Sequence, residues 1–100
     1  MGITVTAHAL QTLQHRTGDF RPWANLEEEI VTEINLALEQ KRVHTRKTEP
    51  FRLYGEKRIP LISRERFVWK QDSSLGWIIR QEGEDWIVMT TLTPRSKATV

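Results

Sequence analysis

The residues best suited to acid–base chemistry are His8 and Arg16, which lie close together near the N-terminus. Cleavage of RNA without a metal ion needs a group that takes the 2′-hydroxyl proton, a cation that stabilises the phosphorane, and a donor for the leaving oxygen. A histidine and an arginine can supply the first two. We therefore take His8 and Arg16 as candidate catalytic residues. The alternative is that His8 is an ordinary surface residue at the end of a helix.

Basic residues are concentrated in the middle of the chain. Ten of the fifteen Lys and Arg residues lie in residues 41–70, where only three glutamates oppose them. Residues 19–39 show the reverse, with six acids against the single base Arg21. A concentrated basic segment is what a polyanion-binding surface requires. We take as candidate nucleic-acid contacts its basic residues and its one tyrosine in the expected strands, namely Arg52, Tyr54, Arg58, Arg64, Arg66 and Lys70.

Two other interpretations of the basic segment remain open. Lys and Arg on the edge of a sheet discourage the addition of further strands, so part of the run would serve only that purpose. A basic sheet face can also bind an acidic protein partner, in which case the chain is a small interaction or regulatory protein without enzymatic activity. DNA binding by a helix-turn-helix is not indicated, because the best helix of the sequence is acidic.

Several function classes lack the residues they would need. The chain has no Cys, which excludes disulfides and thiolate metal sites. His8 and His15 lie about 10 Å apart along a helix, too far to chelate one ion together. No zinc-protease motif, Gly-rich phosphate loop or nucleophile elbow is present, so we expect neither a metal nor a cofactor. No apolar run approaches the length of a membrane helix, and we expect a cytoplasmic protein.

Composition and length predict one domain over residues 1–94, with a frayed tail at 95–100. Residues 3–5 alternate like a short strand, and Thr6 is a suitable N-cap for a helix that stops near Thr17 and Gly18. A second helix follows, with Asn25 as its N-cap and Glu28 completing a capping box. Its apolar residues recur at helical spacing, and we expect it to end near position 41 or 42.

The second half of the chain has the pattern of an antiparallel sheet. Short β-like runs at 51–54, 66–70, 76–81 and 85–93 are separated by turn residues, and the last two face each other across residues 82–84. We therefore predict an α+β fold in which two N-terminal helices pack on one face of a three- to four-stranded antiparallel sheet. Alternation predicts that the other face, open to a ligand, carries Arg66 or Val68 with Lys70, and Ile78 with Arg80.

The four tryptophans allow two interpretations. Bases stack on aromatic rings, so a Trp on an open sheet face could bind single-stranded nucleic acid. Core packing is the more frequent role, because a small domain without disulfides depends on the apolar area that a Trp buries. We assign the tryptophans to the core with Trp69 as the exception, since basic residues surround it.

The order of elements and a short motif resemble a known family. A strand, a helix beginning Thr6-Ala7-His8-Ala9, a second helix and a final group of strands are similar to the RelE-like and BrnT-like toxins and their relatives. His8, Ala9, Leu13 and Arg16 match the first-helix pattern of that group, whereas Thr12 stands where an arginine is usual. The resemblance implies a metal-independent endoribonuclease inhibited by an antitoxin partner. It also implies a phosphate or base contact from a threonine of the last strand, Thr90 or Thr91.

Overall fold

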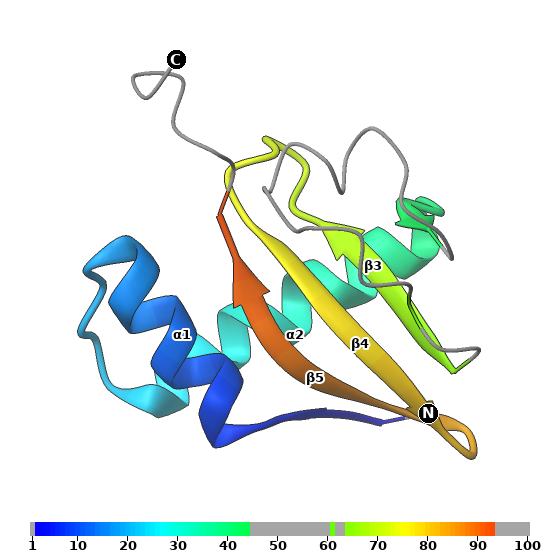
Figure 1. Cartoon of the computed structure of the whole chain (residues 1–100), viewed down its shortest axis with the longest axis horizontal. Helices are drawn as coiled ribbons and strands as arrows, with labels where there is room; N and C mark the ends of the chain where they lie inside the picture. The colour runs from blue at the N-terminus through cyan, green and yellow to red at the C-terminus, as the bar shows by residue number, and fades with distance from the viewer. Residues whose placement is uncertain (1, 45–60, 62–63, 94–100) are drawn as a thin grey trace.

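The computed structural model describes residues 2–44, 61 and 64–93 (Figure 1). The described part contains β1 (Ile3–Val5), α1 (Ala7–Thr17), α2 (Trp23–Glu39), β2 (Val43–His44), β3 (Glu65–Trp69), β4 (Gly76–Glu82) and β5 (Asp85–Leu92). The strand expected at 51–54 and the tail expected at 95–100 lie outside the described residues.

The strands form one mixed sheet in the order β1-β5-β4-β3-β2. The α+β class is confirmed, but a purely antiparallel sheet of three to four strands is wrong, because the described residues hold five strands and β1 runs parallel to β5. Ile3 pairs with Trp86 and Val5 pairs with Val88. Because β1 has only three residues and is distant from β5 along the chain, no local pattern shows whether or how the two strands pair.

The first helix begins and ends where its sequence predicts. The hydroxyl of Thr6 accepts a hydrogen bond from the backbone N–H of Ala9 at 3.1 Å, as an N-cap does. At the other end Gly18 adopts a left-handed conformation with φ of 70°, and its N–H donates to the carbonyl of Gln14 at 2.8 Å. Both ends of α1 are therefore set by local residues.

The second helix departs from its prediction at its start. It begins at Trp23 with Pro22 as the N-cap, so the prediction of Asn25 as N-cap is wrong. The carbonyl of Pro22 accepts from the backbone N–H groups of Asn25 and Leu26 at 3.0 and 3.2 Å, and no side chain caps the helix. The ring of Pro22 restricts its φ, here −52°, and with a ψ of 142° the residue precedes the first helical turn in an extended conformation.

Its C-terminus carries a Schellman motif built on Lys41. This residue has a φ of 57°, and its N–H donates to the carbonyl of Leu38 at 3.3 Å. The N–H of Arg42 donates to the carbonyl of Ala37 at 2.9 Å, which completes the pattern. The helix therefore ends at Glu39, slightly before the predicted position.

The hairpin between β4 and β5 is confirmed. Glu82 pairs with Asp85, which leaves a tight loop of Gly83 and Glu84, and Gly83 has the positive φ of 61° that such a loop requires. Further along, Ile79 pairs with Val88 but Ile78 pairs with Thr90, so β5 contains a bulge at position 89.

The main core joins buried residues of both helices to buried residues of the sheet. Its buried members come from both helices and from β1, β3, β4 and β5: Val5, Ala9, Leu10, Leu13, Leu26, Ile30, Ile34, Ala37, Val68, Trp77, Ile79 and Val88. In Figure 1, α2 runs behind β3, β4 and β5, while α1 lies next to β5. We call this core the helix core.

The bulge changes which residues of β5 share a face. Trp86 and Val88 belong to the helix core, whereas Leu92 is buried in a second cluster on the other side of the sheet. Thr90, which pairs with Ile78, also lies on that second side. Alternation along β5 alone predicts that Trp86, Val88, Thr90 and Leu92 share one face, and this prediction is wrong because strict alternation fails across a bulge.

Candidate nucleic-acid interface

The face of the sheet opposite the helix core carries an aromatic cluster. Phe67 and Leu92 are buried there, with Leu61, Trp69 and Ile78 packed against them. His44 pairs with Phe67 in the register, and Arg80 lies two positions beyond Ile78, so both point to the same side. We call this surface the Trp69 face and define it by His44, Phe67, Trp69, Ile78, Arg80 and Thr90.

Three rings lie side by side on the Trp69 face. The centroids of His44 and Trp69 are 4.8 Å apart with their planes tilted by 32°, and those of Phe67 and Trp69 are 6.0 Å apart in a stacked arrangement. Phe67 is fully buried, while His44 and Trp69 keep part of their surface exposed. The buried ring supports the two partly exposed ones, which forms a platform of the kind on which bases stack.

Two arginines lie near the end of β3 and β4 that is away from Trp69. Arg80 contacts Glu65 at 3.4 Å, and Arg64, just before β3, contacts Glu82 at 3.5 Å. The side chain of Arg64 is 59% exposed. The exposed pair of Arg64 and Glu82 contributes only about 0 to 1 kcal/mol, so a phosphate can replace that carboxylate at little cost, whereas the pair of Arg80 and Glu65 is partly buried. Arg42, which precedes β2, donates to the backbone carbonyl of Trp69 and fixes the edge of the platform.

The two candidate catalytic residues are not brought together. His8 is exposed in the first turn of α1 and Arg16 is exposed in its last turn. Helix geometry places their Cα atoms about 12 Å apart along the axis at 1.5 Å per residue. Because α1 packs on β5, two strand spacings, about 10 Å, also separate it from Arg66 on β3. The described residues thus place His8 and Arg16 about two turns apart on one helix, and their catalytic role stays a prediction.

Two of the predicted nucleic-acid contacts of β3 lie on the side of the helices. Arg66 pairs with Ile79, a member of the helix core, and its guanidinium donates to the backbone carbonyl of Glu65 at 2.7 Å. Lys70 lies 3.9 Å from the carboxylate of Glu29 on α2. The expected placement of Arg66 or Val68 with Lys70 on the open face is therefore wrong, whereas Ile78 and Arg80 do lie there.

Thr91 has a structural role in place of an external contact. It is fully buried, and its hydroxyl donates to the carbonyl of Ala9 at 2.9 Å. Its backbone N–H donates to the hydroxyl of Thr12 at 3.0 Å. These bonds attach α1 to β5, so Thr91 presents no surface to a ligand. An arginine at position 12 could not accept the N–H of Thr91, because a guanidinium has no acceptor atom.

Three predicted contacts lie outside the described residues, and one residue of the Trp69 face was not predicted. The predicted contacts Arg52, Tyr54 and Arg58 lie outside the described residues. Trp69 was identified from its basic neighbours, but the ring beside it, His44, was missed. The sequence pattern for a strand at His44 consists of a single apolar neighbour, Val43, because β2 has only two residues.

Comparison of the chain with models of protein families, with curated proteins and with solved structures finds no match. The described residues contain no group of three or more His, Asp or Glu side chains arranged to hold a metal ion. Neither described helix is long and apolar enough to cross a membrane.

Proposed function

We propose that the protein binds single-stranded RNA on the Trp69 face. The observation that supports this proposal is the partly exposed pair of His44 and Trp69, 4.8 Å apart, with Arg80 on β4 and Arg64 just before β3. The proposal takes both helices as covering the other face of the sheet, because residues of α1 and α2 share a buried cluster with Trp77.

Each group on this face has a definite task in the proposal. The rings of Trp69 and His44 stack with successive bases, an interaction worth about 1 to 3 kcal/mol per base. The guanidinium groups of Arg64 and Arg80 bind phosphates. The imidazole of His44 and the hydroxyl of Thr90 offer hydrogen bonds that a 2′-hydroxyl can use, and this group distinguishes RNA from DNA.

The proposal is limited to binding. Cleavage by His8 and Arg16 would require both side chains to act on one phosphate, whereas about 12 Å of helix separates their backbones. Incubation of the protein with RNA in EDTA, beside His8→Ala and Arg16→Ala variants, tests the point. We expect no cleavage that depends on His8. Loss of a nuclease activity in the His8→Ala variant would restore the endoribonuclease hypothesis.

Fluorescence anisotropy with a labelled 12-nucleotide oligo(U) tests the binding directly. We expect Trp69→Ala to weaken binding by about 5- to 150-fold, which corresponds to the stacking energy of one base. Trp23→Ala is the matched control, because Trp23 is 41% exposed at the start of α2, away from the Trp69 face. Log affinity falls as log salt rises, and Arg80→Gln should make this slope less steep by about 0.7, the contribution of one phosphate contact.

Three results would overturn the proposal. Equal affinity of the wild type and the Trp69→Ala variant would exclude the aromatic platform. An affinity for oligo(dT) equal to or above that for oligo(U) would exclude RNA as the preferred ligand. Binding that does not weaken with salt would exclude contacts to phosphate. Thermal unfolding of each variant shows whether a loss reflects binding or folding.

A further inference from the structure

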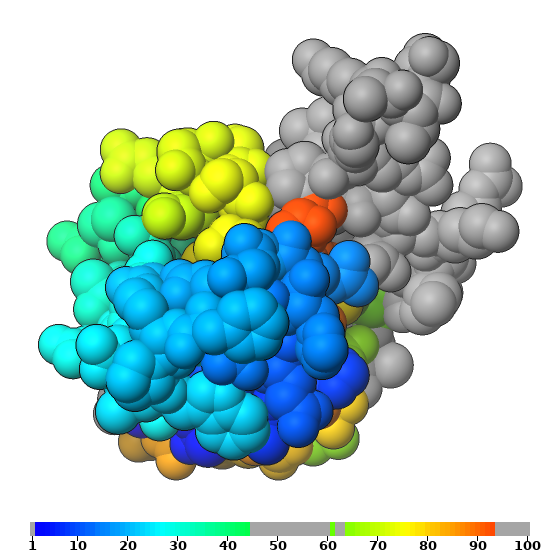
Figure 2. All heavy atoms as spheres, turned by 90° about the vertical axis from the view of Figure 1, so that its left-hand side faces the viewer, coloured from blue at the N-terminus to red at the C-terminus, as the bar shows by residue number. Residues whose placement is uncertain are grey.

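Two large apolar side chains are exposed where α1 connects to α2. Phe20 is 70% exposed and Trp23 is 41% exposed, and no other large hydrophobic residue among those described is classed as exposed. Figure 2 shows the molecule from this side, with α1 and the first turns of α2 forming one face. Exposed aromatic residues of this kind are enriched at the centres of protein interfaces.

The surroundings of these two aromatics are acidic. Glu27 follows Trp23 by four residues, so the two are neighbours on the helix surface, and Glu28 is the next residue. Both glutamates are exposed. We call Phe20, Trp23, Glu27 and Glu28 the aromatic–acidic surface. It belongs to residues 19–39, which carry six acids and one base.

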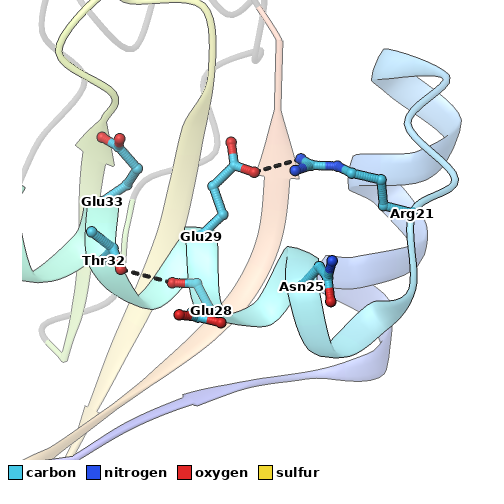
Figure 3. A pocket seen from close by; sticks show the side chains of 6 residues that line it. All are labelled: Arg21, Asn25, Glu28, Glu29, Thr32 and Glu33. Carbon is cyan, nitrogen blue, oxygen red and sulfur yellow. Dashed lines mark hydrogen bonds and ion pairs between the residues drawn. The ribbon is translucent and has the colours of Figure 1, made fainter.

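A shallow pocket continues this surface along α2. It has a volume of about 400 Å³ and is lined by Arg21, Asn25, Glu28, Glu29, Thr32 and Glu33 (Figure 3). Arg21 points toward Glu29 and bonds its carboxylate. Oε2 of Glu33 is buried and accepts no hydrogen bond from the described residues. The carboxylate that the pocket offers to a donor from outside is that of the exposed Glu28.

Arg21, the one base of residues 19–39, is already neutralised. The guanidinium of Arg21 bonds both Asp19, at 2.6 Å, and Glu29. The bonds from Arg21 hold the pKa of the Asp19 carboxyl below its ordinary value, and the two carboxylates raise the pKa of Arg21. This network holds the chain between Phe20 and Trp23, so the two rings are presented from an ordered connection.

We infer that the aromatic–acidic surface binds a basic segment of a partner protein that also carries an apolar anchor residue. The net negative charge selects Lys or Arg side chains, which pair with Glu27 and Glu28 and lie over the ring of Trp23 as cation–π contacts. The anchor residue covers Phe20. RNA is excluded from this surface by like charge, so the inference is independent of the proposed function.

Peptide titrations followed by NMR test the inference. The probe is a 12-residue peptide of Arg, Lys and Leu, compared at 150 mM salt with one in which Ser replaces Leu and one in which Glu replaces Arg and Lys. We expect only the first peptide to bind well and to shift the indole N–H signal of Trp23, leaving that of Trp69 in place. Phe20→Ala and Trp23→Ala should each weaken binding about fivefold or more.

Glu39→Gln is the matched control for Glu28→Gln, because Glu39 is an exposed acid at the other end of the same helix. Glu28→Gln should weaken binding, and Glu39→Gln should leave it within about twofold. Equal losses in both variants, or equal binding of the Ser peptide, would reduce the effect to general electrostatics and overturn the inference. The inference would also be overturned if the protein alone dimerises and Phe20→Ala abolishes the dimer. The surface would then bind a second copy of the chain.

Discussion

Replacing Thr12 by valine should destabilise the fold, because its hydroxyl joins α1 to β5. The oxygen accepts from the backbone N–H of Thr91 at 3.0 Å and donates to the carbonyl of Ala9 at 3.0 Å. Valine keeps the shape and the β-branch of threonine, so the change removes these bonds and little else. The N–H of Thr91 would then lack its partner at the point where α1 covers β5.

The cost follows from that lost partner. A buried group left without a hydrogen bond costs about 1 to 3 kcal/mol, and the partial burial of Thr12 favours the lower part of this range. A loss of about 1 to 2 kcal/mol lowers the Tm of a domain of this size by roughly 4 to 16 °C. Thr91→Val should cost less, because the carbonyl of Ala9 keeps its bond from Thr12.

Thermal unfolding followed by circular dichroism measures these changes. Thr12→Ser is the control, since it keeps the hydroxyl, and its Tm should lie between those of the wild type and Thr12→Val. RNA affinity should be unchanged in Thr12→Val at temperatures where the variant is folded. A Tm of Thr12→Val equal to that of the wild type would refute the structural role. A loss of RNA affinity in the folded variant would assign position 12 to the ligand.

Two further predictions concern the helix ends and pH. Lys41→Gly should raise the free energy of unfolding by about 0.5 to 1 kcal/mol, because glycine adopts the φ of 57° without strain. Gln40→Gly, at a residue with negative φ, should lower it, and urea unfolding measures both changes. Folding lowers the pKa of Asp19 from its ordinary 3.8, so its stabilisation is complete above that pH and declines as pH falls through the lower folded pKa. The Tm advantage of the wild type over Asp19→Asn should therefore shrink below about pH 3.8, and an advantage that grows on acidification would contradict this.

Features specified by neighbouring residues could be predicted from the sequence. Thr6 and Gly18 bound α1, and Gly83 marks the hairpin, because caps and tight turns depend on residues a few positions apart. The parallel pairing of β1 with β5 and the bulge at position 89 could not be predicted, because they depend on strands distant in the sequence. The start of α2 was misplaced because Pro22 replaces a polar cap.

The candidate site divides in the same way. Trp69 could be identified from the charge around it, since composition is a local property. Its partner His44 could not, because a strand of two residues has no periodicity and its pairing with β3 is a tertiary contact. A short sequence motif grouped His8 with Arg16, but the two residues lie about 12 Å apart along the axis of α1.

The indole N–H signals of the four tryptophans during a titration with oligo(U) test RNA binding most directly. They report from separate places: Trp69 on the Trp69 face, Trp77 and Trp86 in the helix core, and Trp23 at the start of α2. We predict that the signal of Trp69 shifts in proportion to bound RNA while the other three remain in place. A saturable shift of Trp23 without one of Trp69, or no shift of any signal at saturation, would contradict the proposed interface.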